Sequence, residues 1–346
     1  MSLLITRGLI TIMSFKHYLF AILLFFIANS SVTAVEILSR IDNGNWESVN
    51  AIYPLKGQDI TLKVAEVPGA TIRWYQIFPD ISQFYQNANH FKSKNPYKWR
   101  GFDKIVYERQ EISQFRDQWE IRPFEDSSGL PENPWSRDVV VSLLYQKELG
   151  SFWFQVEIET EDQIIRKSPG IEDSNKKGLS PKVFRVSIRE KDGYLGYLTS
   201  YFNVPALFGS VTYQSDNYIG SDCADVLVTA YGKWKGKRVR RNYNVAMLVK
   251  KLPKRGEFDL VDGGVPTKTL TWGKDVRPGD FLAVRYPGAK QYQHIAALSD
   301  DANNNGVLDE GDRVLHAGLL PLTYSYLEEG YFDGHIVIVR PTNRLK

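Results

Sequence analysis

Cys223 is the one cysteine of the chain. Two of the five histidines, His294 and His316, lie on stretches that read as neighbouring strands. A thiol becomes a nucleophile when a base takes its proton, and a third group then orients that base. This order of residues therefore predicts acyl-transfer chemistry. Two alternatives stay open. A lone cysteine can be a small buried apolar residue, or the three residues can be zinc ligands that leave a fourth position for water.

Cys223 is expected at the first position of a helix. Asp222 is a suitable N-cap, and apolar residues recur at helical spacing from Val226 to Trp234. Free N–H groups and the helix dipole would favour the thiolate at this position. Asp222 and Asp225 oppose that effect. An imidazolium beside the sulfur would be the larger contribution, so the outcome depends on a histidine.

The two histidines are expected on a hairpin formed by residues 294–298 and 313–317. The register that sets His294 opposite His316 also pairs Ala296 with Val314 and Leu298 with Asp312. Directly opposed side chains lie close enough for one imidazole to orient the other. A slip of one residue would separate the two rings onto opposite faces of the sheet.

The loop between these strands, residues 301–312, follows the pattern of an EF-hand calcium loop. Oxygen-bearing residues occur at alternating positions, a glycine stands at position 6, and aspartate replaces the usual glutamate at position 12. A plain turn rich in Asn and Gly is the alternative. We expect structural calcium, with ligands among Asp301, Asn303, Asn305, Val307, Asp309 and Asp312.

Residues from about 204 to 340 resemble the NlpC-type cell-wall cysteine peptidases, a papain-like family. The resemblance is carried by Asp222-Cys223 opening a helix, Arg277-Pro278-Gly279-Asp280-Phe281 entering a strand, Gln293-His294-Ile295-Ala296-Ala297, and Val314-Leu315-His316-Ala317. It implies that Cys223 is the nucleophile, His294 the base and His316 the orienting residue. It also implies an assisting tyrosine, for which Tyr213 is the best match and Tyr218 a weaker one. The usual Ser-Gly-aromatic sequence after the cysteine is replaced by Ala224-Asp225-Val226, and the two histidines are further apart than is typical.

The rest of the sequence indicates an α+β protein with three parts. Residues 1–34 read as a signal peptide, because Lys16 and His17 precede a short apolar run and a small-residue cleavage site. Residues 35–190 alternate like short strands and predict a β-sandwich, possibly immunoglobulin-like, that could bind an envelope protein or target the chain. Residues 191–346 would be the NlpC-type domain, containing helices and then a sheet.

Composition limits the function. A net charge of +3 in 346 residues does not argue for nucleic acid as a partner. The basic stretch from Lys233 to Arg241 could meet an anionic polymer or lipid, although a solvated face is the simpler interpretation. We therefore expect a periplasmic or extracellular enzyme that cleaves peptide or amide bonds of peptidoglycan peptides. The alternative is a non-catalytic envelope scaffold with a repurposed peptidase domain.

Overall fold

The computed structural model describes residues 34–81, 105–125, 130, 133, 135, 143–175, 178–318 and 320–345. The chain from Val35 onward forms one compact unit. Most of the predicted signal peptide, residues 1–33, lies outside the described residues. Within those residues, no helix combines the length and the apolar character that crossing a bilayer requires. The fold is mixed α+β with more strand than helix, as expected.

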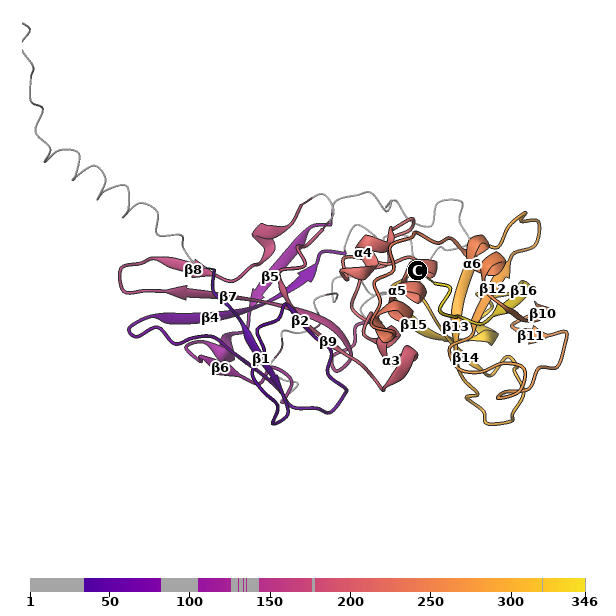
Figure 1. Ribbon diagram of the computed structural model, residues 1–346, viewed down its shortest axis with the longest axis horizontal. Coiled ribbons are helices and arrows are strands. Elements are labelled where there is room, and N and C mark those ends of the chain that lie inside the picture. Colours follow the sequence, from indigo (N-terminus) through magenta and orange to yellow (C-terminus); the bar gives the residue numbers. More distant parts are fainter. Residues whose placement is uncertain are drawn as a thin grey trace, which may run out of the picture. The chain divides into compact units, whose positions relative to one another are not determined.

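Two sheets are built from the chain before residue 190 (Figure 1). Their buried side chains, such as Leu62 and Trp74, belong to one cluster, so the sheets share a core. The strands expected near residues 60, 71, 152 and 183 are confirmed, while the immunoglobulin-like topology stays a prediction. The first sheet has the order β1-β3-β6, from β1 (Leu38–Ile41), β3 (Ile60–Lys63) and β6 (Glu120–Ile121). The second has the order β2-β9-β7-β4-β5, with β8 also paired to β7, from β2 (Ala51–Ile52), β4 (Thr71–Pro79), β5 (Tyr107–Glu111), β7 (Gly150–Glu159), β8 (Ile165–Lys167) and β9 (Phe184–Ile188).

Four α-helices follow the second sheet: α3 (Gly193–Thr199), α4 (Thr212–Asp216), α5 (Cys223–Trp234) and α6 (Val245–Lys251). Elsewhere among the described residues lie three short 3-10 helices, η2 (Ser113–Phe115), η3 (Ile171–Asp173) and η4 (Leu327–Glu329). Helix α5 begins where the sequence predicts, and the Asp222 carboxylate accepts a hydrogen bond from the Cys223 N–H at 2.5 Å. The predicted domain boundary near residue 190 falls at this change from strands to helices and stays a prediction.

The third sheet lies beside the helices (Figure 1) and has the order β11-β10-β16-β12-β13-β14-β15. Its strands are β10 (Lys254–Val261), β11 (Val265–Pro266), β12 (Phe281–Arg285), β13 (His294–Asp300), β14 (Arg313–His316), β15 (Thr323–Tyr326) and β16 (Gly334–Val339). Both faces of its centre are buried, because Phe281 faces the core shared with the helices while Leu282 faces a separate cluster. Helix α5 packs on β13, which brings the Cys223 helix against the His294 strand.

The predicted hairpin register is wrong by two residues. Leu298 pairs with Val314 and Ala297 with Leu315, and a bulge interrupts the ladder between Leu298 and Asp300. The bulge changes the register by one residue within the ladder, which the assumed regular hairpin did not include. Side chains alternate with a period of two, so a slip of two residues keeps both histidines on the same face.

Candidate active site

A cavity of about 340 Å³ contains the three residues that the sequence singles out. Cys223 enters it from the first turn of α5, His294 from the start of β13, and His316 from the end of β14. Its remaining walls are mostly aromatic or neutral, with Asp222 as the one charged side chain among them. The complete lining is Phe208, Asp222, Cys223, Tyr286, Gln293, His294, His316, Gly318, Leu320, Thr323, Gly330 and Tyr331.

The two imidazoles are joined by a hydrogen bond. His294 Nε2 lies 2.9 Å from His316 Nδ1, and the ring centroids are 5.1 Å apart. The chain of contacts continues to β15, where Ser325 Oγ lies 3.0 Å from His316 Nε2. His316 and Ser325 are both buried. The orientation of His294 is therefore fixed by two further side chains on successive strands.

Aromatic packing keeps both imidazoles neutral. The Phe332 ring stacks on His294 with centroids 5.0 Å apart and meets His316 edge-on at 5.3 Å. Burial lowers the pKa of His294 to about 4, although the charge of Asp222 acts in the opposite direction. Burial, followed by the neighbouring His294, lowers the pKa of His316 well below its usual value. A neutral His294 has one ring nitrogen with a free lone pair, which is what a general base requires.

The thiol is also neutral, and its nearest polar partner is a carboxylate. Burial raises the pKa of Cys223 well above its usual value, and the charge of Asp222 and a hydrogen bond to its side chain raise it further. A backbone hydrogen bond with Ile295 acts in the opposite direction. Among the described residues, no hydrogen bond joins the thiol to either imidazole. The environment of Cys223 therefore favours a resting thiol rather than a thiolate.

Asp222 and Asp225 tie one segment of chain to the start of α5. Asp222 accepts a hydrogen bond from the Gly209 N–H at 2.9 Å. Asp225 accepts from the Ser210 hydroxyl at 2.5 Å and from the Ser215 hydroxyl at 2.6 Å. This segment carries Phe208 to the mouth of the cavity. Asp225, one of the departures from the family pattern, is thus a buried anchor.

Burial and the charge of Asp222 raise the pKa of the Asp225 carboxyl to about 7. The two serine hydroxyls act in the opposite direction, because they stabilise the ionised form. Asp225 is 4% exposed, so its protonation state is set almost entirely by these neighbours.

The structure does not bring the predicted assisting tyrosines into the cavity. Tyr213 lies on α4 and packs with a separate apolar cluster, and Tyr218 stacks on Tyr201 with centroids 4.1 Å apart. Tyr286 and Tyr331 line the cavity instead. The Tyr286 hydroxyl donates to the Tyr331 carbonyl at 2.9 Å.

The side chains of the predicted calcium loop are bound to one another. Asp301 accepts hydrogen bonds from the N–H groups of Asn305 at 3.1 Å and Gly306 at 2.8 Å. Asp309 accepts from the side-chain amides of Asn303 and Asn305. The Val307 N–H donates to Asn305 Oδ1 at 2.8 Å.

Asp312 has a different role from the rest of this loop. It is fully buried, and its carboxylate accepts from the Trp272 indole at 2.8 Å and from the N–H groups of Ala302 and Asp309. Across the described residues, no cluster of three or more His, Cys, Asp or Glu is arranged to hold a metal ion. Calcium and the zinc alternative are therefore not assigned.

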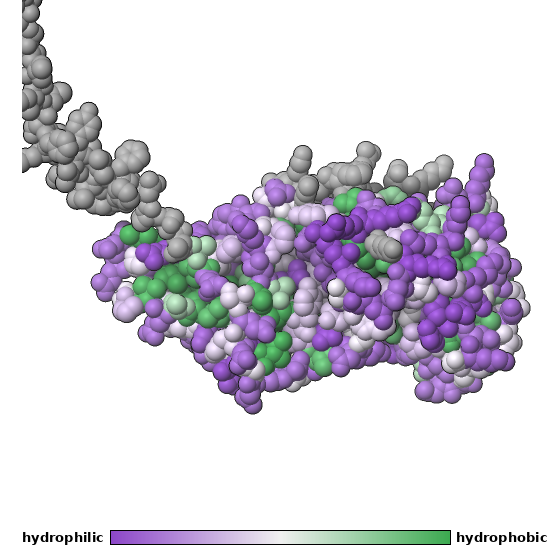
Figure 2. All heavy atoms as spheres, in the orientation of Figure 1, coloured by the Kyte–Doolittle hydropathy of each residue, from purple (hydrophilic) through white to green (hydrophobic). Residues whose placement is uncertain are grey.

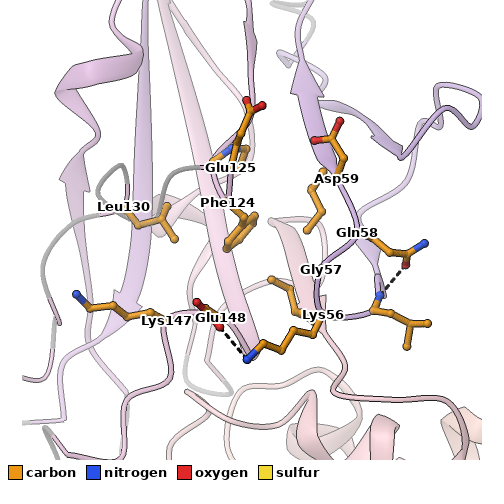
Figure 3. A pocket seen from close by; sticks show the side chains of 13 residues that line it. Lys56, Gly57, Gln58, Asp59, Phe124, Glu125, Leu130, Lys147 and Glu148 are labelled. Carbon is orange, nitrogen blue, oxygen red and sulfur yellow. Dashed lines mark hydrogen bonds and ion pairs between the residues drawn. The ribbon is translucent and has the colours of Figure 1, made fainter.

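A second cavity, of about 440 Å³, lies in the strand-rich part of the chain (Figure 3). Lys56 spans it to form an ion pair with Glu148 at 2.8 Å, and the Leu55 N–H donates to Gln58 at 2.7 Å. Its lining contains no cysteine or histidine. We assign no chemistry to this cavity.

Two residues at the histidine pair are missed by sequence reasoning. Ser325 follows on the next strand, two positions after the Thr323 that pairs with His316. Gly318 faces the His294 ring, since a Cβ placed there would lie 2.9 Å from His294 Cε1. The observed register, continued past β14, sets Gly318 opposite His294. A correct register would therefore have identified this glycine.

Comparison of the chain with protein-family models, with curated proteins and with solved structures finds no match.

Proposed function

We propose that the chain is an exported cysteine hydrolase that cleaves peptide or amide bonds in bacterial cell-wall stem peptides. In this proposal the helices and third sheet correspond to an NlpC-type domain. The observation that supports it most is that Cys223 and His294 line one cavity, while His294 Nε2 is bonded to His316 at 2.9 Å. A nucleophile, a base and a group that orients the base are thereby available in one place.

The hydrogen bonds are compatible with two arrangements of protons, and the proposal requires one of them. If His316 donates its Nε2 proton to Ser325, its Nδ1 accepts the Nε2 proton of His294. His294 Nδ1 then carries the free lone pair, and it can take the thiol proton. The reverse arrangement would protonate Nδ1 and remove the base. His316 is thus a positioning residue for the base, and Ser325 positions His316.

The reaction would proceed by acyl transfer. The thiol proton moves from its hydrogen bond with Asp222 to His294 Nδ1 as sulfur attacks the substrate carbonyl. Collapse of the tetrahedral intermediate breaks the C–N bond, and His294 returns the proton to the leaving amine. Water then attacks the thioester with His294 again acting as base, which releases the acid and restores the thiol. Cys223 and His294 are both neutral before the reaction, so this mechanism does not begin from a thiolate–imidazolium ion pair.

The test is hydrolysis of purified muropeptides by the full chain. We expect Cys223→Ala and His294→Gln to abolish product formation, followed by mass spectrometry. His335→Gln is the matched control, because His335 contacts Glu257 and Asp259 and does not line the cavity. Cleavage that survives Cys223→Ala would reject the proposal.

Calcium at residues 301–312 is a second part of the proposal. Asp301, Asn303, Asn305 and Asp309 already converge on one another, so their oxygens are positioned to surround an ion after local rotation of the amides. Asp312 is committed to the loop backbone and to Trp272. The ion would stabilise the insertion between the two histidine strands, and no reaction step depends on it.

The scaffold function is the second candidate, and the thiol favours it. Cys223 is 7% exposed, its pKa is raised by burial and by Asp222, and it bonds to neither imidazole. In this case the strand-rich part of the chain would bind an envelope protein. Labelling with iodoacetamide across pH discriminates the two. A catalytic thiol reacts near neutral pH because His294 can accept its proton, and an inert thiol does not.

A further inference from the structure

The positive charge of the chain is concentrated in one segment. Residues 226–256 contain ten Lys and Arg and no Asp or Glu. The rest of the chain has 33 Lys and Arg against 40 Asp and Glu, a net charge of −7, although the whole protein carries +3. The segment comprises most of α5, the connection to α6, α6 itself and the start of β10. A modest overall charge therefore hides a strong local asymmetry.

Most of these cations have no carboxylate partner. Lys233 and Arg238 bind Asp216, and Lys254 binds Glu257. In the described part of the chain, the others form no ion pair, and all but the half-buried Lys251 are exposed. Figure 2 shows strongly hydrophilic side chains over the part of this face where Figure 1 places α4 and α6. We name as the basic surface the unpaired set Lys235, Lys237, Arg240, Arg241, Lys250, Lys251 and Arg255.

Aromatic rings lie among these cations. Trp234 is 39% exposed, and Lys235 Nζ lies 3.5 Å from the centre of its ring. The Tyr243 ring is buried: its hydroxyl accepts a hydrogen bond from Lys251 Nζ at 2.9 Å, and Arg241 lies 5.6 Å from the ring, so of these two rings Trp234 is the exposed one. Amphipathic rings beside basic side chains are typical of surfaces that meet lipid head groups, where the ring enters the interface and the cation meets phosphate.

We propose that the basic surface docks on anionic phospholipid, with Trp234 at the level of the head groups. A soluble polyanion would be bound by the cations alone, whereas the exposed indole beside Lys235 gives the apolar contact that a bilayer interface provides. The inference does not depend on the proposed hydrolase activity.

The proposed lipid-binding end of α5 and the cavity that contains Cys223 lie at opposite ends of the helix. Cys223 and Trp234 are the first and last residues of α5, so about 16 Å separates them along the helix axis. A membrane at the Trp234 end would leave the Cys223 end of α5 away from the lipid. Variants of the basic surface should therefore leave the alkylation rate of the Cys223 thiol unchanged.

The experiment compares co-sedimentation of the full chain with two kinds of vesicle. One is phosphatidylcholine alone, and the other contains about 30 mol% phosphatidylglycerol. We expect binding to the anionic vesicles to be much stronger and to be lost in about 0.5 M NaCl, where charges are screened. Equal binding to both vesicles would overturn the proposal, because the apolar N-terminal run alone would give that result.

A charge-matched pair of variants locates the surface. Each Lys or Arg near an anionic membrane strengthens binding about fivefold, so Lys237→Gln, Arg240→Gln and Lys250→Gln together should weaken it about 100-fold. The control removes three exposed cations that form no ion pair elsewhere in the described chain: Arg166→Gln, Lys182→Gln and Lys274→Gln. It should bind nearly as well as the wild type.

Equal loss in the two triple variants would show that only net charge matters and would overturn the assignment. Binding to soluble polyphosphate without binding to anionic vesicles would also overturn it, in favour of a polymer ligand. A loss of binding in Trp234→Ala that exceeds the loss in Lys235→Gln would support insertion of the indole into the interface.

Discussion

The sharpest consequence of the site geometry is the effect of a single methyl group at Gly318. A Cβ at this position would lie 2.9 Å from His294 Cε1, whereas carbon atoms in contact are normally at least about 3.5 Å apart. The ring would have to move by about 0.6 Å. Phe332 stacks on the ring and limits where it can go, so the movement would disturb the 2.9 Å hydrogen bond to His316.

Catalysis is more sensitive to such a movement than stability is. A misplacement of about 1 Å can cost about 100-fold in rate, so we expect Gly318→Ala to lower kcat/KM for muropeptides about 10-fold. The thermal midpoint should fall by only a few degrees, as for a loss of about 1 kcal/mol. Gly256→Ala is the matched control, because its added Cβ would approach the flexible end of Leu270, at 3.1 Å, and would meet Phe258 at an ordinary contact distance of 3.9 Å.

Two measurements check this prediction. Steady-state hydrolysis gives the rate, and NMR of the histidine ring nitrogens reports the His294–His316 hydrogen bond whether or not the enzyme is active. Unchanged kcat/KM together with unchanged imidazole signals would refute the reasoning that Gly318 makes room for the base.

Other predictions concern charge at the site and at the loop. Asp222→Asn should speed alkylation of Cys223 by iodoacetamide at neutral pH, because removing the carboxylate charge lowers the thiol pKa while asparagine still caps the helix; an unchanged rate would contradict it. The acid limb of kcat/KM should lie near pH 4, because the pKa of His294 is about 4, and a limb near 6.5 would contradict burial of the base. Asp225→Asn should gain stability over the wild type in denaturant titrations as pH rises from about 4 to about 7, and the gain should level off above that: the pKa of Asp225 is raised to about 7 in the folded chain, so over this range the unfolded wild type loses the proton that the folded state keeps. Excess Ca²⁺ should raise the thermal midpoint of the wild type and not of Asp301→Asn with Asp309→Asn, and no shift in the wild type would reject the calcium proposal.

Much of the fold around the site follows from local sequence rules. The period of apolar residues after Asp222 gave helix α5 with Cys223 at its first position, and continuous apolar runs gave β12, β13 and β16. The coarse α+β class follows from the same patterns. These features depend on residues close in sequence, so one chain is enough to identify them.

The register of the histidine hairpin depends on how two strands that are separated in the sequence pair with each other. The bulge between Leu298 and Asp300 changes the pairing by one residue, and nothing in the alternation of strand residues specifies it. The contact between the His294 and His316 rings nevertheless agrees with the prediction, since an even slip leaves both on one face. Ser325 and Gly318 could not be identified, because their roles depend on the true register.

The electrostatic environment of the thiol was the least predictable part. From the sequence, the helix N-terminus and a histidine favour a thiolate, and the aspartates oppose it without a clear winner. In the structure, burial is the largest contribution that raises the pKa of Cys223, and Asp222 raises it further by its charge and by a hydrogen bond. The dipole contributes only about 0.3–1 kcal/mol, so it cannot offset burial.

A protonated resting thiol is compatible with hydrolysis only if its proton can reach His294. Asp222 raises the pKa of the Cys223 thiol, caps α5 and binds the Gly209 N–H of the segment that carries Phe208. A substrate that displaces Phe208 would therefore act on the same carboxylate that holds the thiol. This coupling makes Asp222 the residue to test by activity: Asp222→Asn keeps the helix cap, so a change in muropeptide hydrolysis would come from the loss of the carboxylate charge beside the thiol, and a scaffold would show no hydrolysis to change.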